Sequence, residues 1–226
     1  MNASRHPIRT LCAALALSLL GACALPPTAE AATKLPAPLQ DAPHTAVHGE
    51  QVAVFAGGCF WGVQAVFEHV RGVRKTWAGY SGGSAATAHY DQVSEGDTGH
   101  AESVKVLFDP AQVSYGQLLQ VFFSVASDPT ELDRQGPDSG MQYRSVIFYA
   151  SPEQQRIAGA YLDQLGKSRI YTAPIVTQLV PLQAFYPAES WHQDYASHHP
   201  DDLYIAINDA PKVANLERWF PALYSR

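Results

Sequence analysis

The sequence predicts an α+β fold, a ferredoxin-like α/β plait with a βαββαβ core and helices packed on one face of a sheet. Two observations predict it. Short apolar runs that alternate with polar residues are interleaved with segments of helical period, in the order strand, helix, strand, strand, helix, strand. Glycine turns or serine-proline pairs separate these segments. This order is typical of a split βαβ arrangement.

The first half of the core is predicted from residues 52 to 108. A buried strand over 52–56 ends at Gly57-Gly58, and apolar residues then recur with helical spacing from Phe60 until Gly72. Residues 72–80 and 103–108 have strand patterns, and a polar, glycine-containing loop separates them. The sequence therefore predicts strand, helix and two further strands.

The second half follows from helix-start signals. Ser114 with Gln117 forms a capping box, which predicts a helix continuing to about residue 125. A strand over 145–149 ends at Ser151-Pro152, where a helix to about residue 165 begins. An additional strand over 175–180 and a short helix over 211–220 lie in or before a long irregular C-terminal segment.

Composition limits the classes of function. The chain has 226 residues, of which 46% are hydrophobic, so one domain with a sizeable core is expected. Its 15 Lys and Arg against 21 Asp and Glu give a net charge of −6. This mild acidity argues against nucleic acid as a partner and against an anionic membrane surface.

The N-terminus predicts export. Arg5 and Arg9 precede an apolar run over 11–25, which is shorter than the ~20 residues of a spanning helix and fits a signal peptide over residues 1–23. Its end, Leu20-Gly21-Ala22-Cys23, resembles a bacterial lipoprotein processing site that leaves Cys23 lipidated. Ordinary cleavage at 29–31 is the alternative. Either route places the protein in the periplasm or cell envelope, with membrane contact only through a lipid on Cys23.

Residues 24–49 are rich in Pro and Ala and predict a flexible tether. The remaining chain, 50–226, shows no repeat and no second change of composition, so it is expected to be one catalytic domain.

Cys59 is the candidate nucleophile. It follows two glycines at a predicted helix start, where free amides and the helix dipole are expected to favour its thiolate. A free cysteine is often only a small buried hydrophobe. The adjacent Phe60 and Trp61 favour a site, because two aromatic rings beside a sulfur form an apolar wall for a substrate group.

These residues carry a resemblance to a known family. The motif Gly58-Cys59-Phe60-Trp61-Gly62 resembles the peptide methionine sulfoxide reductases of the A type. Four further stretches follow in that family's order, and the likeness covers about residues 52–196, with a plait of the same kind as its fold. These stretches are 79–83 with His89-Tyr90, 96–102, 142–145, and 185–189 with 192–195.

The resemblance implies thiol-dependent reduction of methionine-S-sulfoxide, in proteins and as the free amino acid, through a sulfenic acid on Cys59. Sulfoxide reduction needs a soft nucleophile and a proton for the departing oxygen. Glu102 matches the family's acid, and its neutral form would be favoured beside aromatic rings. Tyr90 and Tyr143 match hydroxyl donors to the sulfoxide oxygen. The matched substrate-binding positions are Phe60, Trp61, Asp138, His192 and Tyr195.

Three other interpretations remain open at this point. A cysteine hydrolase or acyltransferase could pair Cys59 with His100 or His192, because a nucleophile at a helix start also serves acyl transfer. A zinc site among the nine histidines lacks a recognisable ligand spacing. A non-enzymatic envelope protein would be indifferent to the loss of Cys59.

The recycling of Cys59 is the one departure from the usual family pattern. Many members carry resolving cysteines in the C-terminal tail, but residues 196–226 contain none. No bound cofactor is expected, and no metal is expected because the histidines lack a recognisable ligand spacing. The reductant is expected to be an external thiol, from a thioredoxin-like protein or a small molecule, acting on a monomer that repairs oxidised proteins and peptides.

Overall fold

The computed structural model describes Met1, residues 33–42 and residues 49–226. The predicted signal peptide with its candidate lipidation residue Cys23 lies outside the described residues, as do residues 24–32 and 43–48 of the predicted tether. The described residues from 33 onward belong to one compact unit.

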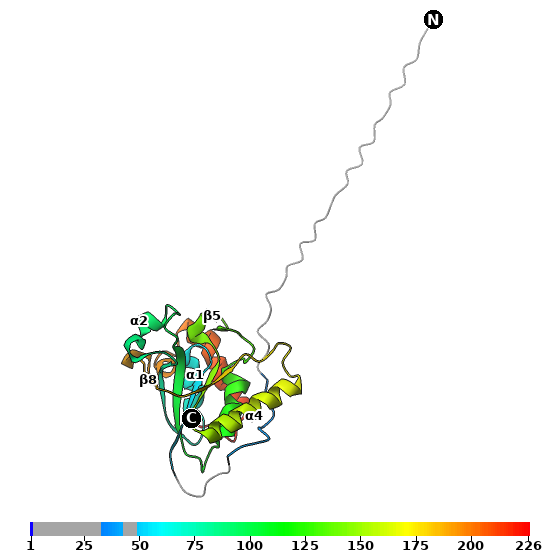
Figure 1. The fold of residues 1–226 in the computed structure, drawn as a ribbon. Coiled ribbons are helices and arrows are strands. Elements are labelled where there is room, and N and C mark those ends of the chain that lie inside the picture. Colours follow the sequence, from blue (N-terminus) through cyan, green and yellow to red (C-terminus); the bar gives the residue numbers. More distant parts are fainter. Residues whose placement is uncertain (2–32, 43–48) are drawn as a thin grey trace. The chain divides into compact units, whose positions relative to one another are not determined.

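A six-stranded mixed sheet forms the centre of this unit (Figure 1). The strands follow the order β7-β6-β1-β3-β2-β8, and every neighbouring pair is antiparallel except β6 with β7. In chain order the strands are β1 (Gln51–Ala56), β2 (Val73–Ser81), β3 (Ala101–Phe108), β6 (Val146–Tyr149), β7 (Gln178–Pro181) and β8 (Tyr186–Pro187). A separate hairpin pairs β4 (Arg134–Gln135) with β5 (Asp138–Ser139).

The helices connect the strands and form the C-terminal region. They are α1 (Phe60–Glu68), α2 (Tyr90–Val93), α3 (Tyr115–Val121), α4 (Pro152–Ser168), α5 (Tyr195–His198) and α6 (Ala210–Trp219). Two π-helical turns, Phe122–Ala126 and Ile205–Asp209, extend α3 and precede α6. Of the helices in the described ranges, none combines the length and the apolar composition that a bilayer crossing requires.

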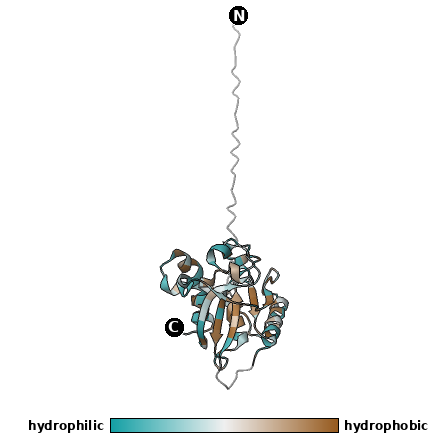
Figure 2. Cartoon of the chain, turned by 60° about the vertical axis from the view of Figure 1, so that its left-hand side comes forward, coloured by the Kyte–Doolittle hydropathy of each residue, from teal (hydrophilic) through white to brown (hydrophobic). Residues whose placement is uncertain are grey.

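The main core lies between the sheet and the helices. Phe55 of β1 points into it and stacks on Phe67 of α1 and on Phe122, with ring centroids 5.2 and 5.1 Å apart. Its neighbours Val54 and Ala56 point to the opposite face, where they join a smaller cluster with Phe148. Figure 2 shows the hydrophobic colour concentrated on the central strands. The opposite directions of Phe55 and its two neighbours follow from the two-residue period of a strand.

The predicted α+β class is confirmed, and each predicted element is present within a few residues. The capping box at Ser114 is confirmed, since its hydroxyl accepts from the Gln117 amide at 3.1 Å and the Gln117 side chain accepts from the Ser114 amide at 2.9 Å. Strand β7 begins later than predicted because the Val176 amide donates to the Pro129 carbonyl, 2.7 Å away, instead of pairing with β6.

The C-terminal segment is less irregular than predicted. After residue 181 it contains β8, α5, the second π-helical turn and α6, of which the sequence pattern indicated only the last. The missed pieces are two to five residues long and gain their stability from packing against α1 and β2, which local periodicity does not report.

The prediction that residues up to 49 form a free tether is wrong for residues 33–42. Leu35 is 2% exposed and belongs to the main core. Its amide donates to the Ser124 hydroxyl at 3.1 Å, and its carbonyl accepts from the Gln120 side chain at 2.8 Å. Asp41 accepts from the Gly116 amide, 2.8 Å away, at the start of α3. A negative side chain is favourable at a helix N-terminus, so this segment is part of the folded domain.

Shortening Leu35 is expected to destabilise the domain. Leu35→Ala removes a fully buried side chain and should lower the free energy of unfolding by about 2–5 kcal/mol. Urea titration of the purified protein measures this change. Leu39→Ala is the matched control, because Leu39 is 86% exposed and its replacement should change the free energy by less than about 0.5 kcal/mol. Equal values for the two variants would contradict docking of this segment.

Candidate active site

Cys59 lies at the start of α1, immediately after β1. Gly58 has φ +96°, a left-handed conformation that favours glycine, and this turn places Cys59 at the N-cap position. The Cys59 side chain makes no capping hydrogen bond, although the Trp61 amide in the first turn of the helix favours its thiolate. The thiol is 9% exposed and is the one free cysteine of the described residues. The structure thus places the predicted nucleophile at a helix start.

The expected low pKa of this thiol is not found. Burial raises the pKa of Cys59 well above its ordinary value, and the nearby carboxylates of Glu102 and Asp209 raise it further. The Trp61 amide and the charge of Lys212 lower this pKa, but they do not outweigh burial. Without a bound substrate the thiol is therefore held protonated, because desolvation exceeds the benefit of the helix start.

Glu102, on β3, lies next to Cys59. Its Oε2 accepts a hydrogen bond from the Phe60 amide at 3.0 Å, so one carboxylate oxygen is fixed one residue from Cys59. Glu102 is 4% exposed, and burial raises its pKa to about 8, although the Phe60 hydrogen bond opposes the shift. A carboxylic acid that keeps its proton at neutral pH can serve as a proton donor.

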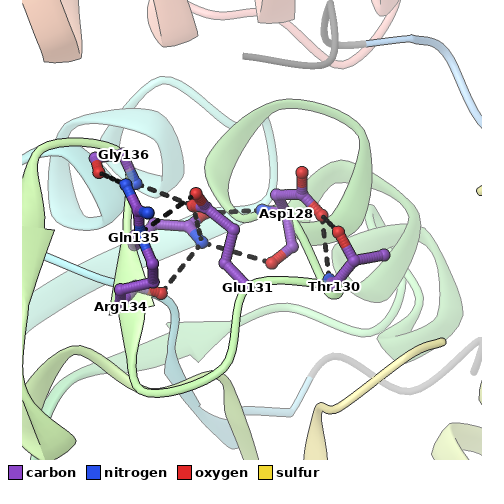
Figure 3. Close-up of polar contacts among 6 residues, drawn as sticks. All are labelled: Asp128, Thr130, Glu131, Arg134, Gln135 and Gly136. Carbon is purple, nitrogen blue, oxygen red and sulfur yellow. Dashed lines mark hydrogen bonds and ion pairs between the residues drawn. The ribbon is translucent and has the colours of Figure 1, made fainter. Parts of the chain in front are cut away.

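A polar loop over residues 128–136 (Figure 3) packs against the turn that precedes Cys59. Gln135 packs against Gly58 so closely that a Cβ at position 58 would overlap its side chain. The Gln135 side chain donates to Glu131 Oε2 at 2.9 Å, and the same oxygen accepts from the Gly136 amide at 2.7 Å (Figure 3). This network fixes the β4–β5 hairpin that carries Asp138.

Three tyrosines surround the thiol and the acid. Burial raises the pKa of Tyr90 and of Tyr143, and in both cases the charge of Glu102 adds to the shift. Burial likewise raises the pKa of Tyr204, with the nearby Cys59 as the next cause. All three hydroxyls therefore keep their protons at neutral pH, and those of Tyr90 and Tyr143 are available as neutral donors. The Tyr204 hydroxyl donates to Asp138 Oδ2.

Aromatic rings form an apolar wall on one side of the site. Trp61 stacks on Tyr195, with ring centroids 3.8 Å apart and an interplanar angle of 11°. The Trp61 indole N–H donates to Nδ1 of His192 at 3.1 Å. The His192 ring lies edge-on to Phe60 at 4.8 Å and near Tyr90 at 4.5 Å. The structure therefore brings Phe60, Trp61, His192 and Tyr195 together around Cys59 and Glu102.

Two glutamines hold the segment that carries His192 and Tyr195. The Gln193 side chain accepts from the Ala78 amide and donates to the Ala78 carbonyl, both at 2.9 Å, so it pairs with β2 as a strand would. The Gln64 side chain of α1 accepts from the Asp194 amide at 3.0 Å. The aromatic wall is thus fixed both to the sheet, through β2, and to helix α1.

The two histidines considered for a hydrolase do not serve as bases. His100 Nδ1 accepts from the Gly83 amide at 3.2 Å and His100 Nε2 lies 2.9 Å from the Ser84 carbonyl, so both nitrogens are engaged away from Cys59. His192 uses Nδ1 as the acceptor for Trp61, and burial lowers its pKa to about 4. The geometry therefore does not support a cysteine-histidine hydrolase. Within the described ranges no three His, Cys, Asp or Glu side chains are grouped as a metal site.

Sequence patterns did not single out three residues that the structure adds to the site. Tyr204 contacts Asp138 and lies edge-on to Trp61 at 6.1 Å. Glu189 accepts from the Tyr90 amide at 3.0 Å and from the Tyr80 hydroxyl at 2.9 Å. Asp209 is 1% exposed and lies against α1. Glu189 falls inside the motif over 185–189, which was a usable signal. Tyr204 and Asp209 lie beyond residue 196, where the family likeness had ended and gave no signal.

Comparison with known proteins gives one consistent result. The family model described as "Peptide methionine sulfoxide reductase" matches residues 51–222. "Peptide methionine sulfoxide reductase MsrA 2" of Mesorhizobium japonicum is 57% identical over 180 residues, covering 80% of this chain and 92% of that protein. The protein of the same name from Synechocystis is 51% identical over 176 residues, covering 78% of this chain and 82% of the relative.

Solved structures agree. Reduced Mxr1 from Saccharomyces cerevisiae matches with a TM-score of 0.60 and 29% identity, covering 67% of this chain and 86% of that chain. Methionine sulfoxide reductase A of Corynebacterium diphtheriae matches with a TM-score of 0.58 and 34% identity, covering 67% of this chain and 76% of the other.

Proposed function

The chain belongs to the peptide methionine sulfoxide reductase family, and on this basis we propose the roles of its site residues, its reductant and its location. The enzyme reduces methionine sulfoxide to methionine in a thiol-dependent reaction. Protein repair is therefore its function, and the proposals below concern how and where it acts.

Cys59 is the nucleophile and Glu102 the proton donor. The Cys59 sulfur attacks the sulfoxide sulfur while Glu102 gives its proton to the oxygen, and the proton that the thiol loses returns Glu102 to its acid form. The oxygen then passes to Cys59, which becomes a sulfenic acid, and methionine leaves with its sulfur reduced. The Glu102 carboxylate supports this assignment, because burial raises its pKa to about 8 and the Phe60 amide fixes it beside Cys59.

The surrounding side chains bind the substrate. Tyr90 and Tyr143 donate hydrogen bonds to the sulfoxide oxygen, where negative charge increases as sulfur is attacked. Phe60 and Trp61 contact the methyl group, with His192 and Tyr195 fixing the indole. Asp138 accepts from a substrate backbone amide through the carboxylate oxygen that Tyr204 leaves free.

One observation carries the proposal: the Glu102 carboxyl is hydrogen-bonded to the amide next to Cys59 in a buried, aromatic site. Reductases of this kind are specific for one sulfoxide epimer, and the family resemblance selects the S epimer. Purified protein with dithiothreitol should consume the S epimer of a peptide methionine sulfoxide and leave the R epimer. Consumption of the R epimer alone, or of neither, would refute the proposal.

An external thiol returns Cys59 to its starting state. The sulfenic acid condenses with that thiol, which releases water and forms a mixed disulfide, and a second thiol then displaces Cys59 as a free thiol. The absence of cysteine from residues 60–226 supports this route. A thioredoxin-like protein is the partner of the right chemistry, because its second thiol is already in place.

The enzyme acts in the cell envelope. Export is supported by Arg5, Arg9 and the apolar run over 11–25, and lipidation by the motif that ends at Cys23. Nine residues, 24–32, lie between Cys23 and the docked segment that begins at residue 33, and they span at most about 35 Å, so the catalytic domain stays close to the membrane.

Replacing Cys23 tests this location. Cys23→Ser should move the enzyme from the membrane fraction of the native cell to the soluble periplasmic fraction, because the lipid anchor is lost. Fractionation with an antibody against the domain measures the change. Unprocessed protein in the cytosol, or an unchanged distribution, would contradict it.

The finer fold assignment is a ferredoxin-like plait. Its support is the strand order β6-β1-β3-β2 with antiparallel neighbours. Helix α1 connects β1 to β2, and α3 lies between β3 and β6 along the chain, which is the connectivity of two interleaved βαβ units.

A further inference from the structure

A buried ion pair lies directly on the first turn of the catalytic helix. Asp209 Oδ1 accepts from Lys212 Nζ at 3.0 Å, and the two side chains are 1% and 20% exposed. Both pack against Gly62, where any Cβ would overlap the Asp209 carboxylate and approach Lys212 Nζ to 2.9 Å. Glycine at position 62 is therefore what allows the pair to reach the backbone of α1.

The same helix turn carries the reactive groups. The Phe60 amide donates to Glu102, Cys59 is the N-cap residue and Gly62 lies in the first turn, so the ion pair, the acid and the thiol share one helix start. Asp209 Oδ2 has no hydrogen-bond partner among the described residues. A buried carboxylate with one unsatisfied oxygen is costly, which points to a use for its charge.

The charges that face Cys59 come from several elements. Glu102 approaches from β3, and Asp209 and Lys212 approach from the C-terminal segment. The neutral hydroxyls around it belong to Tyr90, Tyr143 and Tyr204, whose own titration is affected by Cys59. Among these groups Lys212 is the cation, and Asp209 is the carboxylate that the reaction does not consume as an acid.

We propose that Asp209 and Lys212 are positioning residues that set the protonation of Cys59. Burial is the main reason that the resting thiol is neutral, and the Asp209 carboxylate adds to this effect. Lys212 opposes Asp209, so that a thiolate still forms when substrate binds. The inference rests on the proposed role of Cys59 as the nucleophile. It explains why an ion pair is buried on this turn, because a charge acts most strongly where water is excluded.

This arrangement protects a thiol that has no internal partner. Hydrogen peroxide oxidises the thiolate, not the thiol, to a sulfenic acid with release of water, and a second peroxide gives the sulfinic acid. The domain has no further cysteine to trap the sulfenic acid as a disulfide. Suppression of the resting thiolate therefore reduces irreversible oxidation between catalytic cycles.

Alkylation of Cys59 by iodoacetamide tests the inference without any sulfoxide. Its rate is measured from pH 5 to 10 by mass spectrometry of the peptide that contains Cys59, which separates this thiol from any other. Asp209→Asn should raise the rate at pH 7.5 by about tenfold, equal to a decrease of about one unit in the pKa of the thiol. Lys212→Met should lower the rate by about three- to tenfold.

Glu217→Gln is the control, because Glu217 is exposed on the same helix α6 and should leave the alkylation profile unchanged. Shifts in opposite directions for the two pair variants support the inference, since a loss of packing alone would not change sign with charge. Shifts in the same direction, or none, overturn it. If Asp209→Asn does not fold, Lys212→Met decides alone, and an unchanged profile refutes the proposal.

The proposed function of Cys59 and its electrostatic coupling to Asp209 and Lys212 can be refuted separately. Opposite shifts in a protein that reduces no sulfoxide would refute the proposed function of Cys59 and leave the electrostatic coupling in place. Normal reduction with no shift would refute the coupling alone.

Discussion

Cys59→Ser is expected to abolish turnover of a peptide methionine sulfoxide. A serine hydroxyl is a hard, weakly acidic nucleophile that does not accept the sulfoxide oxygen, so no sulfenic acid can form. The expected loss in kcat exceeds about 10⁴-fold and reaches the detection limit of an assay with dithiothreitol as reductant.

The fold should survive this replacement. Cys59 is at an N-cap position, where serine is a favourable residue, so the midpoint of urea unfolding should change little. A folded Cys59→Ser protein that retains a measurable share of wild-type turnover would contradict the assignment of the nucleophile.

Glu102→Gln is expected to slow turnover by roughly 10² to 10⁴-fold. The glutamine carbonyl can still accept from the Phe60 amide, so the local geometry is kept while the proton is lost. The value of KM should change much less than kcat, because the site is not emptied.

The pH profile separates an acid from a structural residue. Burial raises the pKa of Glu102 to about 8, so the proton is present below that pH and lost as the pH rises through it. The wild-type rate should therefore fall above about pH 8, and this fall should be absent from Glu102→Gln. A variant that keeps the wild-type rate, or the same fall, would show that Glu102 is not the acid. Glu153→Gln, at an exposed position of α4, is the control.

Local signals predicted the framework of the site. The Gly57-Gly58 turn, the helical period from Phe60 and the capping box at Ser114 each depend on interactions within a few residues, and each is present in the structure. The adjacency of Phe60 and Trp61 to Cys59 likewise predicted an apolar wall at this helix start, and the structure contains one.

What the sequence did not predict depends on contacts between distant segments. Leu35 lies in a proline-rich stretch without period, and its burial depends on Gln120 and Ser124, 85 and 89 residues away. In the sequence, Asp209 resembles an ordinary exposed carboxylate near a helix start. Its burial depends on contact with Gly62 of α1, which lies far away along the chain. The pKa of Cys59 was misjudged for the same reason, since the helix start is a local feature whereas burial is not.

A single turnover without reductant directly tests whether Cys59 takes the sulfoxide oxygen and becomes a sulfenic acid. Reduced protein is mixed with an excess of a peptide methionine-S-sulfoxide, and both methionine and the intact protein mass are measured. About one methionine per Cys59 is expected, with one added oxygen on the protein that a sulfenic-acid reagent traps at that residue. A protein that is instead lighter by two hydrogens, with an intramolecular crosslink, or that yields no methionine, would contradict it.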